Sequence, residues 1–230
     1  MLCLIRVGLL VLVAMSVIPS ARADARVDFC FNYGCVSQAA VTFNERELAR
    51  VRDALRRAGN AVAERGAIAR AVATLYRTAG GTTPIAADRA GNLADDGVYG
   101  RMDCIDHSTN TTRLLRLLES RGWLRYHRVL EPQRRARIIF QHFSAVIEEM
   151  DVAAPADVAA ATLADYVPLL LALCDCPMPV APRASAVGAE TPPPAAGARF
   201  VVDSWFVDQG EPAVVLPLAD WLNGEGPNVQ

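Results

Sequence analysis

Apolar side chains recur at helical spacing in two stretches near the beginning of the chain. In residues 43–57 the apolar positions share one face, opposite a charged face, and Asn44 is a candidate N-cap. These apolar positions are Leu48, Val51 and Leu55. Residues 61–78 predict a second helix that ends at Gly80-Gly81. The arginines on both helices are expected to form a solvated face rather than a binding patch.

A third helix and a small sheet are predicted further along the chain. Residues 82–100 are rich in Gly, Asp and Thr without periodicity, and they predict a loop. The helix begins near Cys104 and ends at Gly122, with a leucine-rich face. Strands are predicted at residues 124–130, 137–148 and 198–206, and a short closing helix at 217–223. This mixture of helices and strands predicts an α+β fold.

Residues 153–198 interrupt this pattern. They combine an Ala-rich stretch with a proline-rich, low-complexity part at 177–197, which we expect to be mobile. We interpret residues 153–198 as an insertion in a single domain that spans residues 24–230.

Residues 1–23 have the pattern of a secretory signal peptide. Arg6 precedes an apolar run at residues 7–17, and residues 21–23 form a small-x-small cleavage site. The apolar run is short for a bilayer span, and a retained N-terminal anchor is the alternative. We therefore expect a periplasmic or secreted protein with no stable membrane insertion after signal cleavage.

Charge and composition narrow the possible functions. The chain has 23 basic and 25 acidic residues, without the concentrated basic face that binding to nucleic acid requires. All of the basic residues are arginines, which excludes a lysine nucleophile or Schiff base. We expect no nucleic-acid partner and no cofactor.

The cysteines leave one thiol without an obvious bridge. The chain has 6 cysteines, one of which lies within residues 1–23, so an odd number remains after cleavage. Cys30 and Cys35 can bridge each other across a short turn. Cys174 and Cys176 either bridge locally or exchange partners with the first pair, since connectivity is not readable from sequence. Cys104 has the most suggestive surroundings for the free thiol, although a different free cysteine stays open.

Three residues have the types and the order that cysteine nucleophiles use. Cys104 opens a helix, where exposed N–H groups and the helix dipole favour a thiolate. His142 lies on a predicted strand and would act as base and then as acid. Asp203 on the following strand would hold the imidazole in its required tautomer. Each residue alone also has a purely structural interpretation, such as a buried cysteine or a core histidine.

The segments around these residues are residues 103–106 with the leucine-rich helix, residues 141–146 and residues 200–205. They resemble the Cys-bearing unit, the His strand and the Asp strand of the transglutaminase-like superfamily, closest to its bacterial cysteine proteinases. The resemblance spans roughly residues 95–150 and 198–210. It implies a papain-like or transglutaminase-like core with N-terminal helices, a Cys-bearing helix and a small antiparallel sheet.

The same resemblance bears on metal binding. In a periplasmic adhesin-processing subgroup the residue after the cysteine is acidic and helps to bind calcium. Here that residue is Ile105, although Asp103 and Asp106 flank it. We predict no metal ligand in the site.

Several alternatives stay open. His107 is three residues after Cys104 and would share its helix face, so it is an alternative base. Cys104-x-x-His107 together with Cys174-x-Cys176 also has zinc-ligand spacing. His127 is expected to be structural or solvent-facing. The oxyanion hole would use the Cys104 backbone N–H and one further donor. The candidates for that donor are Asn32, Tyr33, Asn92 and Tyr99.

The sequence therefore predicts an exported cysteine hydrolase, similar to a peptidase or an amidase, with a Cys104-His142-Asp203 triad. Its substrate would be an envelope protein or a peptidoglycan peptide amide, and hydrolysis is favoured over cross-linking. The main alternative is a catalytically silent envelope binding protein with the same fold.

Overall fold

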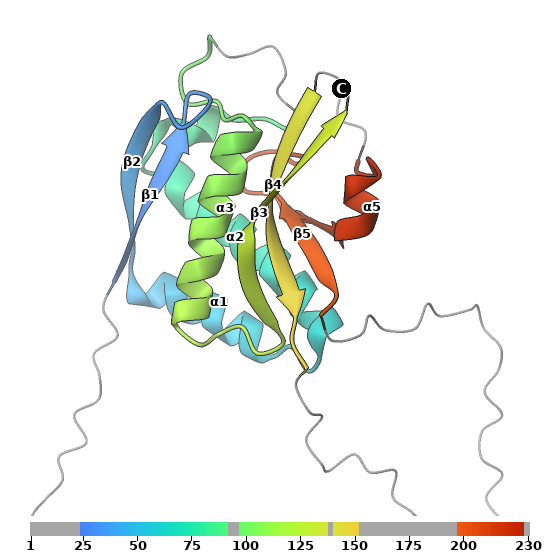
Figure 1. The fold of residues 1–230 in the computed structure, drawn as a ribbon. Helices are drawn as coiled ribbons and strands as arrows, with labels where there is room; N and C mark the ends of the chain where they lie inside the picture. Colours follow the sequence, from blue (N-terminus) through green and yellow to red (C-terminus); the bar gives the residue numbers. More distant parts are fainter. Residues whose placement is uncertain (1–23, 92–96, 138–139, 152–196, 228–230) are drawn as a thin grey trace, which may run out of the picture.

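The computed structural model describes residues 24–91, 97–137, 140–151 and 197–227. Within them, helices combine with two small antiparallel sheets, so the predicted α+β class is confirmed (Figure 1). Some predictions fall outside the described residues. They are the signal peptide, nearly all of the insertion at 153–198 with its segment 177–197, Asn92, and the pair Cys174 and Cys176.

An N-terminal hairpin precedes the helices and was not predicted from the sequence. Strand β1 (Ala25–Phe31) pairs antiparallel with β2 (Ser37–Phe43). Burial alternates along the first four residues of β1, as expected for a strand with one face on the core, and the last three residues are all buried. Cys30 and Cys35 form a disulfide across the turn, which is one of the pairings that the sequence allowed.

The two predicted N-terminal helices are confirmed. Helix α1 (Glu45–Arg56) begins after Asn44, whose side chain accepts hydrogen bonds from the backbone N–H groups of Arg46 and Glu47. Glu47 bonds back to the Asn44 N–H and completes a capping box. Helix α2 (Ala61–Gly80) follows, and the described part of the predicted loop after it includes the short 3₁₀ helix η1 (Pro84–Ala87).

Helix α3 (Cys104–Ser120) begins at the cysteine that the sequence singled out. Asp103 is its N-cap, and the chain turns away near Gly122, which has a φ of 67°. Figure 1 shows α3 between the β1–β2 hairpin and the larger sheet. Its buried leucines therefore pack against both sheets. They are Leu114, Leu115 and Leu118.

The larger sheet has the strand order β3-β4-β5-β6, with every neighbouring pair antiparallel. The strands are β3 (His127–Arg137), β4 (Phe140–Glu149), β5 (Arg199–Asp203) and β6 (Val214–Pro217). The short helix α5 (Leu218–Leu222) follows, near its predicted place. Strand β3 runs seven residues past its predicted end at 130. Its later half is charged because it lies at the sheet edge, where apolar alternation is not required.

The two faces of this sheet contribute to different apolar clusters. Ala145 and Ile147 of β4 join the main core with the helices and the hairpin. Val146, between them in sequence, faces the other way because strand side chains alternate. That second face carries the aromatic cluster, defined here as Val146, Val201, Trp205, Phe206 and Trp221.

Strands β4 and β5 pair directly although the predicted insertion separates them in sequence. Ala145 lies opposite Val202, and the pairing continues to Glu148 opposite Arg199.

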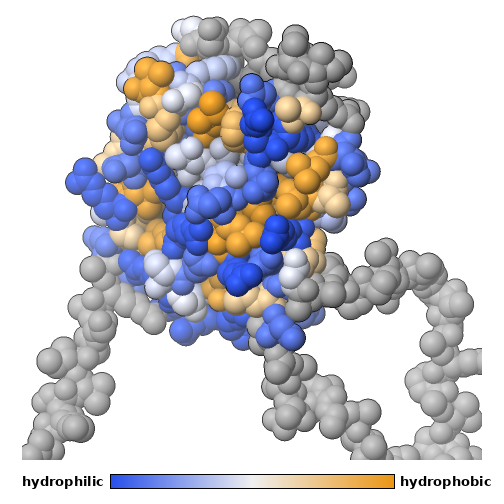
Figure 2. All heavy atoms as spheres, viewed as in Figure 1, coloured by the Kyte–Doolittle hydropathy of each residue, from blue (hydrophilic) through white to orange (hydrophobic). Residues whose placement is uncertain are grey.

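Polar and apolar side chains are interspersed on the face of the molecule that Figure 2 shows. None of the helices in the described part of the chain is both long and apolar enough to cross a membrane.

Candidate Cys-His-Asp site

The structure brings His142 and Asp203 into direct contact. The imidazole Nε2 lies 2.7 Å from Asp203 Oδ2, which is a short, charge-assisted hydrogen-bond distance. His142 is on β4 and Asp203 ends β5, so the pairing of these two strands sets the geometry. Asp203 is 1% exposed, and His142 is 9% exposed. The pair is therefore largely shielded from water.

Asp203 receives two further hydrogen bonds. The indole Nε1–H of Trp221 donates to Oδ2 at 2.9 Å, and the backbone N–H of Trp205 donates to Oδ1 at 3.2 Å. A buried carboxylate needs such partners because its desolvation is costly. Trp221 was missed as a site residue, since the sequence predicted only its helix.

Aromatic rings surround the imidazole of His142. Its ring centroid lies 4.7 Å from that of Trp205, 5.3 Å from that of Phe206 and 5.6 Å from that of Trp221. These rings lower the local dielectric, which strengthens the hydrogen bond to Asp203. Since Nε2 is engaged by the carboxylate, Nδ1 is the nitrogen left to exchange a proton with a substrate or a nucleophile.

Cys104 lies against the strand segment that contains His142. Its Sγ is 3.8 Å from the carbonyl oxygen of Gln141, and it packs against the aromatic cluster. It is partly exposed, and it is the free cysteine among the residues that the structure describes. Cys104 at the start of α3 thus lies beside the strand that carries His142, and His142 on β4 contacts Asp203 on β5.

The ionisation of Cys104 differs from the sequence prediction. Burial raises the pKa of the thiol above its usual value, and the nearby carboxylates Asp103 and Asp203 raise it further. A hydrogen bond from the Phe143 backbone opposes this shift without reversing it. The helix start alone predicted a favoured thiolate, whereas burial and the two carboxylates disfavour it.

His107 is held away from the role of alternative base. Its Nδ1 lies 2.9 Å from Ser204 Oγ, and its Nε2 lies 3.0 Å from Asp88 Oδ2. Both ring nitrogens thus face partners other than Cys104. His127 is buried, and its Nδ1 lies 2.8 Å from Glu64 Oε2. Of the two alternatives predicted for it, structural or solvent-facing, the structural one therefore applies.

The residues with metal-ligand spacing lie partly outside the described residues. Cys174 and Cys176, half of the predicted zinc spacing, lie outside the described residues. Within the described ranges, one group of potential ligands converges, formed by Cys30, Cys35 and Asp106. The two sulfurs are joined in the disulfide, so this group lacks the thiolates that zinc requires.

The acidic residues at the start of α3 hold a tight loop. Asp106 accepts the Cys35 N–H at 2.6 Å, and Asp103 accepts the Gly34 N–H at 3.0 Å. Asn32, Tyr33, Gly34 and Cys35 all have φ between 60° and 66°, a left-handed conformation that non-glycine residues rarely adopt. Burial, followed by the charge of Asp103, raises the pKa of Asp106 to about 6.

One predicted oxyanion donor is already engaged. The Asn32 side chain donates to Ser37 Oγ at 2.9 Å and accepts the Gly100 N–H at 2.8 Å. The Asn32 amide is therefore engaged in hydrogen bonds to Ser37 and Gly100. Tyr99 is 66% exposed, with its ring against Phe31, so its hydroxyl is accessible from solvent.

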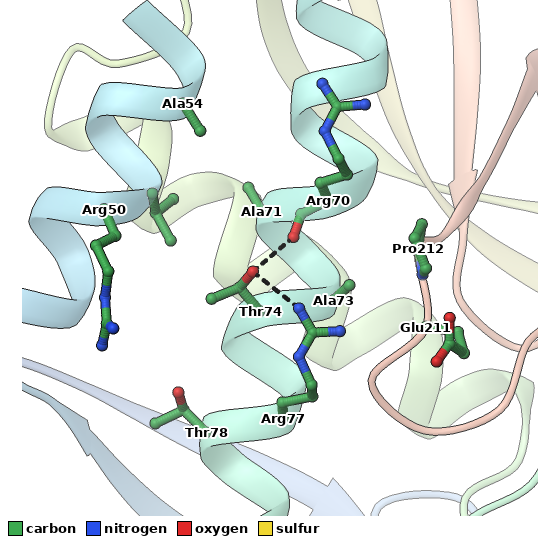
Figure 3. A pocket seen from close by; sticks show the side chains of 11 residues that line it. Arg50, Ala54, Arg70, Ala71, Ala73, Thr74, Arg77, Thr78, Glu211 and Pro212 are labelled. Carbon is green, nitrogen blue, oxygen red and sulfur yellow. Dashed lines mark hydrogen bonds between the residues drawn. The ribbon is translucent and has the colours of Figure 1, made fainter.

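A groove of about 610 Å³ lies over the outer face of α2. Figure 3 shows Arg50 of α1 on one side, Arg70 and Arg77 on α2, and Glu211 on the opposite side. Cys104, His142 and Asp203 do not line it. Arg50 and Arg70 are solvent-exposed, in agreement with the predicted solvated face, whereas Arg65 on α2 is buried and pairs with Glu149 at 2.7 Å.

No family model, no curated protein and no solved structure matches this chain. The contacts around Cys104, His142 and Asp203 are therefore the basis for a proposed function.

Proposed function

We propose that this protein is an exported cysteine hydrolase, similar to a peptidase or an amidase, built on a papain-like or transglutaminase-like core. The observation that carries the proposal is the buried 2.7 Å contact between His142 and Asp203, beside a cysteine that opens a helix. A cysteine, a base and a group that orients the base are the three parts that such chemistry needs.

In the proposed reaction, Cys104 Sγ attacks an amide carbonyl while its proton passes to Nδ1 of His142. This transfer accompanies substrate binding, because burial raises the pKa of the resting thiol and disfavours a free thiolate. Asp203 stabilises the resulting imidazolium through its contact with Nε2. The C–N bond then breaks as His142 returns the proton to the leaving amine, which leaves an acyl group on the sulfur.

Hydrolysis completes the cycle. His142 takes a proton from a water molecule, the hydroxide adds to the thioester carbonyl, and the C–S bond breaks. The carboxylic acid leaves and the thiolate regains its proton from His142. The backbone N–H of Cys104 at the helix start supports the transient oxyanion. We assign the substrate as an amide of an envelope protein or of a peptidoglycan peptide in the periplasm or outside the cell.

The test uses a peptide vinyl sulfone, an electrophile that reacts with cysteine when a neighbouring base takes its proton. Peptide mapping should locate the label on Cys104 in the native protein. His142→Ala and Asp203→Asn should slow the labelling by at least about tenfold, since each removes a hydrogen-bonded charge worth more than about 1.4 kcal/mol. The proposal fails if native Cys104 reacts no faster than Cys104 in the urea-unfolded protein.

A catalytically silent binding protein is the second candidate. The raised pKa of Cys104 and the three aromatic rings around His142 favour it, since both are also features of a packed interior. In that case Cys104→Ser would leave the binding of its envelope partner unchanged. The vinyl sulfone would then label Cys104 no faster in the native protein than in the unfolded protein.

A further inference from the structure

The residue after Asp203 is held on the opposite face of the sheet from Asp203 itself. Ser204 Oγ lies 2.9 Å from His107 Nδ1, 2.9 Å from Thr111 Oγ1 and 3.4 Å from the Tyr76 hydroxyl. Asp203 faces His142 and the aromatic cluster, and adjacent strand residues point to opposite faces. The end of β5 therefore makes side-chain contacts on both faces of the sheet.

The contacts to Ser204 come from the helix that carries Cys104. His107 lies one turn after Cys104 on α3, and Thr111 lies one turn further. Both contact Ser204. The nucleophile and the residue beside Asp203 are thus connected through a single helical turn and one side-chain contact.

Asp88 extends this connection to the other flank of Cys104. Its Oδ2 lies 3.0 Å from His107 Nε2, and its Oδ1 accepts the backbone N–H of Met102 at 2.9 Å. Met102 immediately precedes the N-cap of α3. Three residues after Asp88, the N–H of Gly91 donates to the Trp205 carbonyl at 2.9 Å. The segment 88–91 therefore binds both the approach to Cys104 and the segment that follows Asp203.

These contacts are deeply buried. Asp88 is 0% exposed, His107 is 2% exposed and Ser204 is 6% exposed. Burial alone would lower the pKa of His107, but the Asp88 carboxylate more than offsets this and raises it. His107 thus contacts the Asp88 carboxylate through Nε2 at ion-pair distance and the Ser204 hydroxyl through Nδ1 at hydrogen-bond distance. Such a chain is directional, and it is costly to break in a dry interior.

We propose that His107 is a positioning residue: its contact with Ser204, with Asp88 on the other side of the ring, sets the distance between Cys104 on α3 and the His142–Asp203 pair. Strand pairing fixes His142 against Asp203, whereas among the described residues no backbone–backbone hydrogen bond joins α3 to the sheet. Glu119 accepts the Val129 N–H at 2.7 Å, but at the end of α3 that is far from Cys104. The leucine packing of α3 is non-directional and tolerates small sliding movements. Hydrogen bonds near the Cys104 end remove that freedom. A displacement of about 1 Å can cost roughly a hundredfold in rate.

The catalytic meaning of this inference rests on the proposed hydrolase function, whereas its geometric content does not. Two substitutions of His107 separate the two contacts. The amide of Asn reaches the place of Nδ1, so His107→Asn can keep the bond to Ser204 and lose Asp88. The longer amide of Gln reaches the place of Nε2, so His107→Gln can keep Asp88 and lose Ser204.

The first measurement is the rate at which the vinyl sulfone labels Cys104, read beside the melting temperature. Ser204→Ala and His107→Gln should slow labelling about tenfold, the effect of one lost hydrogen bond of about 1.4 kcal/mol. His107→Asn should slow it less than about threefold, at a melting temperature similar to that of His107→Gln. Equal rates in the two His107 variants, or a wild-type rate in Ser204→Ala, would overturn the inference.

The second measurement separates failure of this inference from failure of the enzyme proposal. NMR measures the nuclear Overhauser effect between the β protons of Cys104 and the ring protons of His142, which reports the distance between α3 and the His142–Asp203 pair. This effect should weaken more in Ser204→Ala and His107→Gln than in His107→Asn. If the wild-type Cys104 proves unreactive while this order holds, positioning stands and the hydrolase proposal fails. An unchanged effect in all three variants overturns the positioning role.

Discussion

Trp221 and His142 contact the same oxygen of Asp203, the indole nitrogen at 2.9 Å and the imidazole Nε2 at 2.7 Å. Trp221 comes from α5, close to the end of the described chain. The C-terminal helix is therefore part of the candidate site, because it completes the hydrogen bonding of the buried carboxylate.

Replacement of Trp221 by Phe should destabilise the protein beyond the loss of packing. The lost hydrogen bond to a buried carboxylate is worth about 1.5–3 kcal/mol of unfolding free energy, measured in urea. Trp123→Phe is the matched control, since Trp123 is equally buried and its Nε1 has no hydrogen-bond partner among the described residues. Equal losses in the two variants would contradict a role for the Trp221 bond.

Arg135 should hold α5 in place. Its guanidinium donates to the carbonyls of Trp221 and Glu225, at 2.6 and 2.9 Å, and lies 4.7 Å from the Trp221 ring centroid. Arg135→Met removes these contacts and should cost about 1–2 kcal/mol. Faster hydrogen exchange of the α5 amides would show the loosening. Arg134→Met, whose arginine bonds only the side chain of Gln141 in the described structure, should leave that exchange unchanged.

Asp106 should make stability depend on pH. Its pKa is raised from 3.8 to about 6 in the folded protein, so between about pH 6 and 4 the folded form binds a proton that the unfolded form does not. The resulting stabilisation is fully present below about pH 4 and is lost as pH rises through about 6. Urea unfolding at several pH values should show this slope flattened in Asp106→Asn. The exposed Asp53→Asn variant controls for the loss of one carboxylate, and an unchanged slope in Asp106→Asn would refute the assignment.

The disulfide between Cys30 and Cys35 should stabilise the loop that contacts the start of α3. It closes a loop with a sequence separation of 5, for which the chain-entropy model gives about 2 kcal/mol. The double variant Cys30→Ser/Cys35→Ser should therefore unfold at a lower urea concentration. The backbone amides of residues 35 and 34 donate to Asp106 and Asp103. Their hydrogen exchange should also increase, because the loop that holds them in place is loosened. An unchanged urea midpoint would count against this role.

Local sequence signals predicted the helices well. The spacing of Leu48, Val51 and Leu55 and the cap at Asn44 are properties of a few adjacent residues, and α1 formed as expected. The hairpin was missed for a local reason too. Its turn passes through four residues with positive φ, three of them not glycine, so it lacks the glycine-rich sequence that usually identifies such a turn.

The candidate site shows where sequence reasoning stops. The order of Cys104, His142 and Asp203 was readable because thiol chemistry requires those residue types. The contact of His107 with Ser204 joins residues 97 positions apart, so no local sequence pattern predicts it. The raised pKa of Cys104 likewise depends on burial and on Asp203, which only the folded chain brings near.

The closed end of the β4–β5 ladder has a consequence for protein engineering. The Glu149 N–H donates to Ala198 at 2.8 Å, and the Gly197 N–H donates back to Glu149 at 2.7 Å. The two strands thus meet like the legs of a hairpin, whatever length of chain joins them, and closing a longer connection costs little extra entropy. This junction is a natural graft point, where a foreign domain or a short turn can be exchanged while His142 and Asp203 keep their register.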